Sequence, residues 1–416
     1  MRVLCCGTVL LSMVLALSGC DNATSSSGQN LVMEGKTMGT VWRVTVADVP
    51  ASRRSQLQQV IQQQLDNDDQ ELSTWKTDSA LSRFNQYTGT RPWPVSEAMA
   101  DIVTMALRIG AKTGGAMDIT VGPLVNLWGF GPEKMPAHTP AQQQIDQAKA
   151  RTGLRHLKVI QTADGQALQK DLPDLYVDLS TMGEGYATDH LARLMESQGI
   201  TNYLVSVGGA LLSRGHTAEG KPWRVAIQKP TDLENEAQAV VDLQGHGIST
   251  SGDYRNYYEL DGQRISHIID PATGRPIEHK LASATVIATT AGEADGWDTG
   301  LMVLGTEKAK ALALKQHLAV FLITRNGDKF ESWASPLFKS FLLTEAKYPL
   351  RSNNKPCWIF LRATPRGRRH WQKTLSSCGV MPGMMITGCS TRLWRLPASV
   401  PFSTGLPPAV FGCRWR

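Results

Sequence analysis

The stretch ASATVIATTAGEADGWDTGLMVLG, residues 282–305, decides the fold, because within it a strand pattern runs directly into a helix pattern. Asp295 lies three residues before Asp298 and four before Thr299, so on a helix these side chains share one face. Two carboxylates and a hydroxyl suit Mg²⁺, which prefers oxygen ligands and leaves positions for substrate phosphates. The alternative is helix capping, since Asp and Thr are common at helix starts.

The rest of residues 31–348 continues this interleaving of strand and helix patterns. Residues 41–49 alternate apolar and polar side chains, as a half-buried strand does, and residues 319–333 resemble a hairpin around an Asn-Gly-Asp turn. Residues 52–72 have an apolar helical face, and residues 96–115 begin with a serine cap and end on glycines. We therefore predict an α+β fold with mixed or antiparallel sheets and packed helices, and not a Rossmann fold.

A second group of oxygen side chains lies in YVDLSTMGEGYATD, residues 176–189. The pattern predicts a strand, a tight turn and a helix, with Asp178, Thr181 and Glu184 around the turn. Such a helix N-terminus would favour an anionic ligand. A plain strand-to-helix turn with a Ser or Thr cap explains the same residues without a ligand.

Two more segments carry single polar residues of interest. In GGAMDIT, residues 114–120, glycines end a helix and Asp118 is predicted to lie in an apolar strand. In RISHIID, residues 264–270, His267 is predicted to lie in another strand, where a lone histidine is more often structural than catalytic. The sequence contains no Walker A, G-x-G-x-x-G, G-x-S-x-G or H-E-x-x-H motif, which excludes several common enzyme classes.

Charge and cysteine are concentrated at the ends of the chain. Residues 349–416 hold eleven Lys and Arg and no Asp or Glu, so subtracting them from the net charge of +6 leaves −5 for the rest. The basic balance therefore does not predict a nucleic-acid partner for the main body. Residues 21–356 contain no cysteine, which excludes a disulfide framework and a thiolate metal site there.

The N-terminal residues are typical of an exported lipoprotein. Residues 1–19 combine Arg2 with a short apolar run, as a signal peptide does. Leu17 to Cys20 resemble the bacterial lipobox, in which the cysteine is lipidated, and residues 20–30 then form a flexible tether. We expect the body to be anchored through Cys20 to the inner membrane on its periplasmic side. An ordinary secretory signal with a chance cysteine is the alternative.

Residues 349–416 break the pattern of the body, with eight Pro, four Trp and four Cys and no helical or strand period. They are predicted to form an unstructured basic tail. An interaction tail and a product of a shifted reading frame both account for this composition, and the second is favoured.

Several segments together resemble the ApbE family of FAD:protein FMN transferases, in family order between about residues 31 and 348. The segments that carry the resemblance are GKTMGT, GGAMDITVGPLVNLWGFGP, VDLSTMGEGYATDHL, YLVSVGGALLSRG, GISTSGDYRNYY, SHIIDPATGRPI and EADGWDTGLMVLG. The resemblance implies an ApbE-like fold and an enzyme that binds FAD and Mg²⁺. It also implies transfer of FMN to a threonine of an acceptor flavoprotein, with release of AMP. Acceptors in the family are subunits of membrane redox complexes, the sodium-pumping quinone reductase and the Rnf complex.

The same resemblance assigns roles to residues. It implies metal ligands at Thr181, Asp295, Asp298 and Thr299, and a general base at His267. It implies contacts with FAD at Met38, Trp75, Ala116, Met117, Asp118, Asp178, Glu184 and Ile269. For Trp75, burial in the core is an equally good alternative to stacking on a ring of FAD.

Two residues depart from the family pattern, and two other functions stay open. Met182 stands where relatives usually have a smaller residue, and Gly296 where they often have alanine, so both are expected to loosen the site. A FAD pyrophosphatase would use the same metal site with water as the attacking group. A periplasmic lipoprotein that carries FAD without chemistry is less consistent with Asp295, Asp298, Thr299 and His267.

Overall fold

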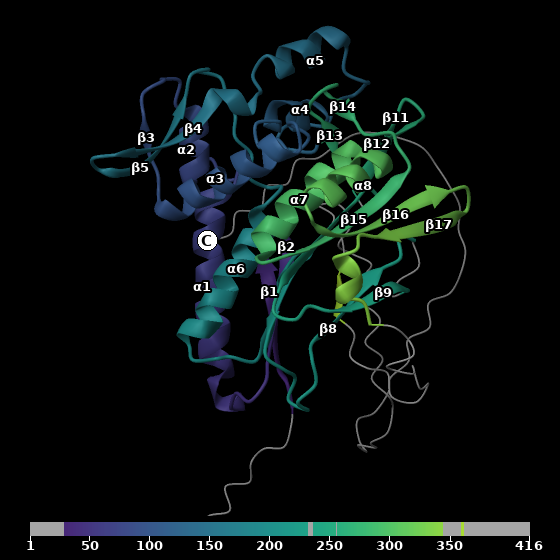
Figure 1. Ribbon diagram of the computed structural model, residues 1–416. Helices are drawn as coiled ribbons and strands as arrows, with labels where there is room; N and C mark the ends of the chain where they lie inside the picture. The colour runs from purple at the N-terminus through teal and green to yellow at the C-terminus, as the bar shows by residue number, and fades with distance from the viewer. Residues whose placement is uncertain (1–28, 232–235, 255, 344–358, 362–416) are drawn as a thin grey trace, which may run out of the picture. The chain divides into compact units, whose positions relative to one another are not determined.

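The computed structural model describes residues 29–231, 236–254, 256–343 and 359–361, and it is built around one large sheet (Figure 1). This sheet has eight strands in the order β1-β2-β6-β7-β10-β15-β16-β17, and every neighbouring pair in it is antiparallel. The predicted α+β class is therefore confirmed. The strands of the large sheet are β1 (Leu31–Thr37), β2 (Thr40–Val46), β6 (Tyr203–Val207), β7 (Ala210–Arg214), β10 (Gly247–Gly252), β15 (Leu281–Ala288), β16 (Ala319–Asn326) and β17 (Lys329–Ala334).

Smaller sheets surround the large one. They are built from β3 (Trp93–Pro94), β4 (Leu157–Thr162), β5 (Gly165–Lys170), β8 (Arg224–Gln228), β9 (Ala237–Asp242), β11 (Tyr257–Leu260), β12 (Gln263–Ser266), β13 (Ile269–Asp270), β14 (Arg275–Pro276) and β18 (Ile359–Leu361). Strand β18 pairs with β8 in parallel, the single parallel pairing among the described strands, and it lies in the segment that we predicted to be without structure.

The helices are α1 (Arg54–Leu72), α2 (Ala80–Gln86), α3 (Glu97–Lys112), α4 (Gly122–Leu127), α5 (Gln142–Lys149), α6 (Gly183–Ser197), α7 (Ala291–Leu304) and α8 (Thr306–Lys315). Short 3₁₀ turns are η1 (Ala51–Arg53), η2 (Leu154–His156) and η3 (Phe338–Ser340). The predicted strand, the two predicted helices and the hairpin correspond to β2, α1, α3 and β16–β17, and are confirmed.

Alternation along the strands divides the core between the two faces of the large sheet. In β15, Val286 packs in the cluster that includes α3, α7 and α8, whereas the next residue, Ile287, packs against β8 and β9 on the other face. A further cluster joins α1 and α6 to β1, β2, β6 and β7. The sheet is thus covered by helices on one face and by the small β8–β9 sheet on the other.

Two of the polar segments do not form the strands that we predicted. Asp118 lies in a turn region, and its carboxylate accepts hydrogen bonds from the backbone N–H of Thr120 at 2.7 Å and from its hydroxyl at 2.6 Å. Asp178 lies in an extended segment outside any ladder, and its carboxylate accepts from the N–H of Ser180 at 2.9 Å. In both places a short polar side chain binds the backbone locally, which competes with strand pairing.

The predicted strand around His267 was also wrong, because His267 falls between β12 and β13 and in neither strand.

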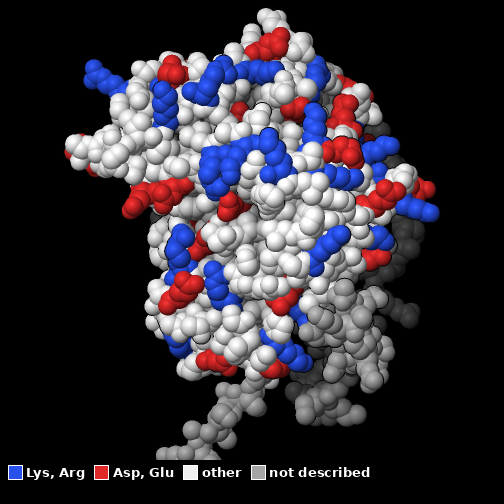
Figure 2. All heavy atoms as spheres, viewed as in Figure 1, with Lys and Arg blue, Asp and Glu red and all other residues white. Residues whose placement is uncertain are grey.

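On the face shown in Figure 2, basic and acidic side chains are interspersed. No helix within the described residues is long and apolar enough to cross a membrane.

Candidate active site

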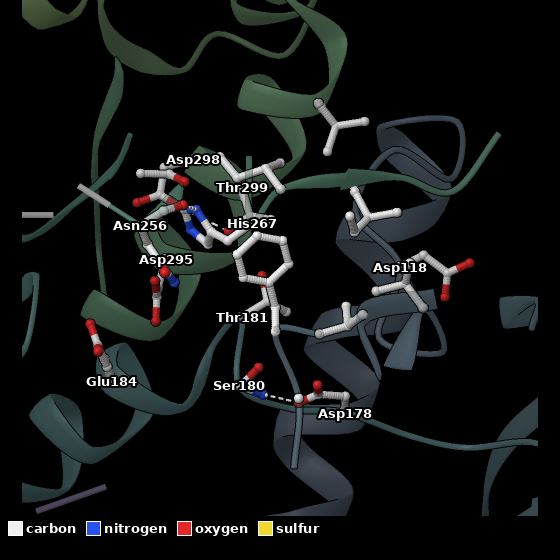
Figure 3. A pocket seen from close by; sticks show the side chains of 18 of the residues that line it. Asp118, Asp178, Ser180, Thr181, Glu184, Asn256, His267, Asp295, Asp298 and Thr299 are labelled. Carbon is white, nitrogen blue, oxygen red and sulfur yellow. Dashed lines mark hydrogen bonds between the residues drawn. The ribbon is translucent and has the colours of Figure 1, made fainter. Parts of the chain in front are cut away.

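One pocket brings together side chains from α7, from the turn before α6, from the end of β10 and from the segment after α3 (Figure 3). The predicted site residues that line it are Trp75, Ala116, Asp118, Asp178, Thr181, Glu184, His267, Ile269, Asp295, Asp298 and Thr299. Met38 and Met117 are not among the lining residues. Met38 lies in the β1–β2 turn and packs beside the α1–α6 cluster, and Met117 is fully buried in the core. Cys20 lies outside the described residues.

Helix α7 presents the two predicted carboxylates from its body and not from its N-terminal end. Thr290 caps the helix by accepting a hydrogen bond from the N–H of Glu293 at 3.1 Å, and Asp189 accepts from the N–H groups of Ala291 and Gly292 at 2.8 and 2.9 Å. Because these residues already satisfy the helix end, capping does not account for Asp295 and Asp298.

Asp295 joins α7 to two neighbouring elements. One carboxylate oxygen accepts a hydrogen bond from the N–H of Gly185 in α6 at 2.9 Å, and the other accepts from the hydroxyl of Ser249 in β10 at 3.2 Å. The helices approach closely here, since a Cβ on Gly185 would lie 2.4 Å from the carbonyl oxygen of Ala291. Glycine at this position therefore allows the N-terminus of α6 to reach the carboxylate.

The remaining oxygen atoms form a partly buried cluster at the same place. Asp298 is only 1% exposed, and the hydroxyl of Thr299 lies 3.3 Å from its carboxylate. The hydroxyl of Thr181 is buried and makes no hydrogen bond within the described part of the chain. A buried hydroxyl without a partner is costly, so its position in the same pocket as two carboxylates fits a cation that would bind it.

This oxygen set is too small to enclose a metal ion alone. Within the described residues no group of three or more His, Cys, Asp or Glu side chains could hold a metal. Two carboxylates with two hydroxyls fit Mg²⁺, which usually keeps some positions for water and substrate phosphates.

Glu184 and Asp118 are two further carboxylates that line the pocket. The carboxylate of Glu184 accepts a hydrogen bond from the N–H of Gly209 at 2.8 Å, which ties the first turn of α6 to the β6–β7 hairpin. Burial raises the pKa of Asp118, while the hydrogen bonds from Thr120 act in the opposite direction. Both carboxylates thus add polar groups to the pocket that the cluster on α7 lines.

His267 has a defined orientation at the pocket wall. Both its backbone N–H and its Nδ1 approach the carbonyl oxygen of Asn256, at 3.2 and 3.0 Å. A carbonyl oxygen only accepts hydrogen bonds, so Nδ1 carries the proton, and in the neutral ring Nε2 is the basic nitrogen.

Trp75 is 54% exposed although it lines the pocket, so the core alternative is wrong for this residue. An exposed indole at a pocket is available for stacking on an aromatic ligand.

The two residues that depart from the family pattern are neighbours in space. A Cβ on Gly296 would lie 2.8 Å from Cδ1 of Ile109 and 3.2 Å from Cε of Met182. The longer Met182 side chain therefore packs where the side chain of residue 296 is missing, and Met182 is completely buried. The expected loosening is not seen in the packing around these two positions.

Some lining residues were not predicted from the sequence. Ser249, Thr250 and Asn256 reach the pocket from the end of β10 and the segment after it. The run of hydroxyl residues in GISTSG was a usable signal, but its strand period gave no indication of which face meets α7.

The α+β fold thus carries a group of carboxylate and hydroxyl oxygens between α6 and α7, in a pocket that an exposed indole also lines. Such a pocket fits a ligand that has both phosphates and an aromatic ring. Known proteins are similar to this chain. The model of the ApbE family matches residues 38–322. The chain is 66% identical to a FAD:protein FMN transferase of Salmonella typhimurium, over 83% of this chain and 99% of the relative. It is also 66% identical to the protein of the same name from Escherichia coli K12, over 81% and 97%.

Solved structures agree with these sequence relatives. The flavin transferase ApbE from Vibrio cholerae superposes with a TM-score of 0.70 at 42% identity, covering 76% of this chain and all of that one. The apo flavinyl transferase ApbE from Pseudomonas stutzeri gives a TM-score of 0.68 at 37% identity, covering 76% and 97%. The chain belongs to the ApbE family and is an enzyme, a transferase.

Proposed function

We propose that this chain is a Mg²⁺-dependent FAD:protein FMN transferase, which moves FMN from FAD to a threonine of an acceptor flavoprotein and releases AMP. The observation that carries the proposal is that one pocket is lined by Asp295, Asp298 and Thr181, whose hydroxyl has no hydrogen-bond partner among the described residues. The relatives' shared name, FAD:protein FMN transferase, supports the substrate and the reaction.

Asp295, Asp298, Thr299 and Thr181 would hold the metal ion. When bound, Mg²⁺ would supply charge stabilisation for the pyrophosphate of FAD and for the departing AMP. The two aspartates are then ionised, which makes them poor candidates for the general base. Trp75 would contact a ring of FAD, and Ala116, Asp118, Asp178, Glu184 and Ile269 would line the rest of its binding site.

His267 would act as the general base. Its Nε2 would take the proton of the acceptor threonine hydroxyl while that oxygen forms a bond to the phosphorus of the FMN half of FAD. The bond from this phosphorus to the bridging oxygen breaks, and AMP leaves with that oxygen. The hydrogen bond from Nδ1 to the Asn256 carbonyl supports this role, because it keeps Nε2 unprotonated in the neutral ring.

We further propose where the enzyme works. The lipobox ending at Cys20 supports a lipid anchor in the inner membrane, with the body in the periplasm, where it would modify periplasm-facing subunits of quinone reductase and Rnf-type complexes. A Cys20→Ala variant should lose the acyl chains by mass spectrometry and leave the membrane fraction. Retention of that variant in washed membranes would refute the anchor.

The reaction is tested with the whole chain, FAD, Mg²⁺ and a purified acceptor flavoprotein. Acceptor mass and AMP are followed with and without EDTA, and with Mn²⁺ in place of Mg²⁺. A mass gain of one FMN that EDTA abolishes supports the transferase. AMP and free FMN with an unlabelled acceptor would instead identify a pyrophosphatase, and bound but unchanged FAD a carrier.

A further inference from the structure

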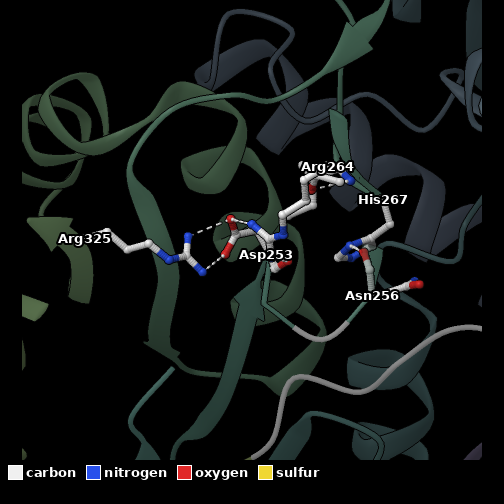
Figure 4. Close-up of polar contacts among 7 residues, drawn as sticks. Asp253, Asn256, Arg264, His267 and Arg325 are labelled. Atoms are coloured by element: carbon white, nitrogen blue, oxygen red, sulfur yellow. Dashed lines mark hydrogen bonds and ion pairs between the residues drawn. The ribbon is translucent and has the colours of Figure 1, made fainter. Parts of the chain in front are cut away.

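An ion-pair cluster around the buried Asp253 is formed by residues that do not line the pocket (Figure 4). Asp253 is 5% exposed, and its carboxylate accepts hydrogen bonds from both terminal nitrogens of Arg325, at 2.8 and 3.0 Å. Arg264 donates to the same carboxylate at 3.1 Å and to the backbone carbonyl of Asp253 at 2.6 Å. Paired, charge-assisted bonds of this kind are among the stronger and more directional contacts in proteins.

The cluster joins elements that no strand pairing connects. Arg325 belongs to β16 of the large sheet, and Arg264 belongs to β12, which pairs with β11 in a separate two-stranded sheet. Asp253 directly follows β10, and its N–H donates to the carbonyl of Ala282 at 3.1 Å. The carboxylate of Asp253 therefore attaches strand β12 to the large sheet.

The histidine directly follows the same strand, β12. Arg264 lies three residues before His267, and Asp253 lies three residues before Asn256, whose carbonyl accepts from the backbone and the ring of His267. The Asp253–Arg264 contact and the Asn256–His267 contact are thus successive links between the same two segments (Figure 4). Because only two residues separate Asp253 from Asn256, loss of the first link is expected to move the carbonyl oxygen that accepts from Nδ1 of His267.

We propose that Asp253 is a positioning residue for His267: held by Arg325 and Arg264, it keeps the Asn256 carbonyl in place and so keeps the proton of the histidine ring on Nδ1. This inference rests on the proposed role of His267 as general base. A buried carboxylate whose only task is to hold the hairpin would stabilise the fold without controlling the histidine tautomer.

The test uses the whole chain with Asp253→Asn, which preserves side-chain size and removes the charge that pairs with the arginines. Histidine labelled with ¹⁵N reports the tautomer directly, and the His267 signal is assigned by its loss in His267→Gln. We expect the Nδ1–H form of His267 to lose population in Asp253→Asn. We expect kcat for FMN transfer to fall by about 10- to 100-fold, by analogy with the loss typical of groups that orient a metal-binding histidine, while the KM for FAD changes little.

Asp68→Asn is the matched control. Asp68 is a buried aspartate, 2% exposed, that is paired with His190 at 2.6 Å and does not line the pocket. Its replacement should lower the midpoint of urea unfolding and leave both kcat and the His267 signal unchanged. Arg264→Gln, at a partly exposed position, provides a second variant if Asp253→Asn does not fold, and is expected to shift the tautomer in the same direction.

The outcomes separate this inference from the proposed function. An unchanged Nδ1–H signal in both Asp253→Asn and Arg264→Gln overturns the positioning role, whether or not kcat falls. Full activity of His267→Gln would overturn the base assignment instead, and the ¹⁵N signal would still decide whether Asp253 controls the ring.

Discussion

Replacing Gly185 with alanine should push α6 and α7 apart at the oxygen cluster. The added Cβ would lie 2.4 Å from the carbonyl oxygen of Ala291 and 2.8 Å from Cβ of Asp295. The first contact is with backbone, which cannot rotate away, so the helices must separate by about 1 Å to reach a normal separation of roughly 3.5 Å.

The size of the effect follows from three contributions. Overpacking of this kind costs about 1–3 kcal/mol, and loss of the hydrogen bond from the Gly185 N–H to Asp295 costs about 1.5–3 kcal/mol because its acceptor is charged. Replacing glycine by alanine in a helix raises the free energy of unfolding by about 1 kcal/mol. The free energy of unfolding should therefore fall by about 1.5–5 kcal/mol, and metal-dependent turnover should fall with it because Asp295 is displaced.

Gly183→Ala is the matched control in the same helix. A Cβ at Gly183 would meet no atom within 4 Å, so this variant should be as stable as the parent or more stable by up to about 1 kcal/mol. Urea unfolding and FAD turnover are measured for both variants. Equal unfolding midpoints for Gly183→Ala and Gly185→Ala would refute the close approach of the two helices as the reason for glycine at 185.

Three further predictions concern the metal, the indole and a buried lysine. Asp298→Asn removes a carboxylate of the proposed metal site, so Mg²⁺ affinity, measured by titration calorimetry, and FMN transfer should both fall at least about tenfold. Unchanged Mg²⁺ binding would show that the metal binds at another place. Trp75→Ala should weaken FAD binding, measured by flavin fluorescence, by about 1 kcal/mol or roughly fivefold, and an unaltered Kd would exclude stacking. Burial lowers the pKa of Lys170 from 10.5 to about 8 in the folded chain, so the unfolded chain binds the extra proton and stability should rise with pH between about 8 and 10.5. In Lys170→Met the rise in stability should be absent when urea unfolding is measured across this pH range. If the rise persists, another titrating group causes it.

Much of the site could be predicted because its chemistry depends on local spacing. Asp295, Asp298 and Thr299 were identified from a helical period alone, and that period held because Thr290 and Asp189 fix where α7 begins. The predicted strands around Asp118 and Asp178 failed for an equally local reason. Each carboxylate binds the backbone two residues further on, and an apolar pattern contains no information about that competing bond.

Contacts between segments that are distant in the sequence could not be predicted from local sequence patterns. Met38 and Met117 belong to segments that carry the family resemblance, yet one packs beside the α1–α6 cluster and the other lies in the core. Asp253 and Arg325 are 72 residues apart, and nothing in either segment indicates that they pair. The compensation between Met182 and Gly296 likewise became visible only when α3, α6 and α7 were packed together.

The sequence by itself determined the α+β class, the helix that carries two carboxylates and a hydroxyl, and the segments that resemble a flavin transferase. These follow from periodicity and end signals, which act over a few residues. Only the tertiary structure decided that the sheet is antiparallel with β10 between β7 and β15, and that α6 meets α7 at Gly185. It alone decided that Asp253 ties β12, the strand just before His267, to that sheet. These features depend on which faces are buried against each other, and burial is a property of the whole packed chain.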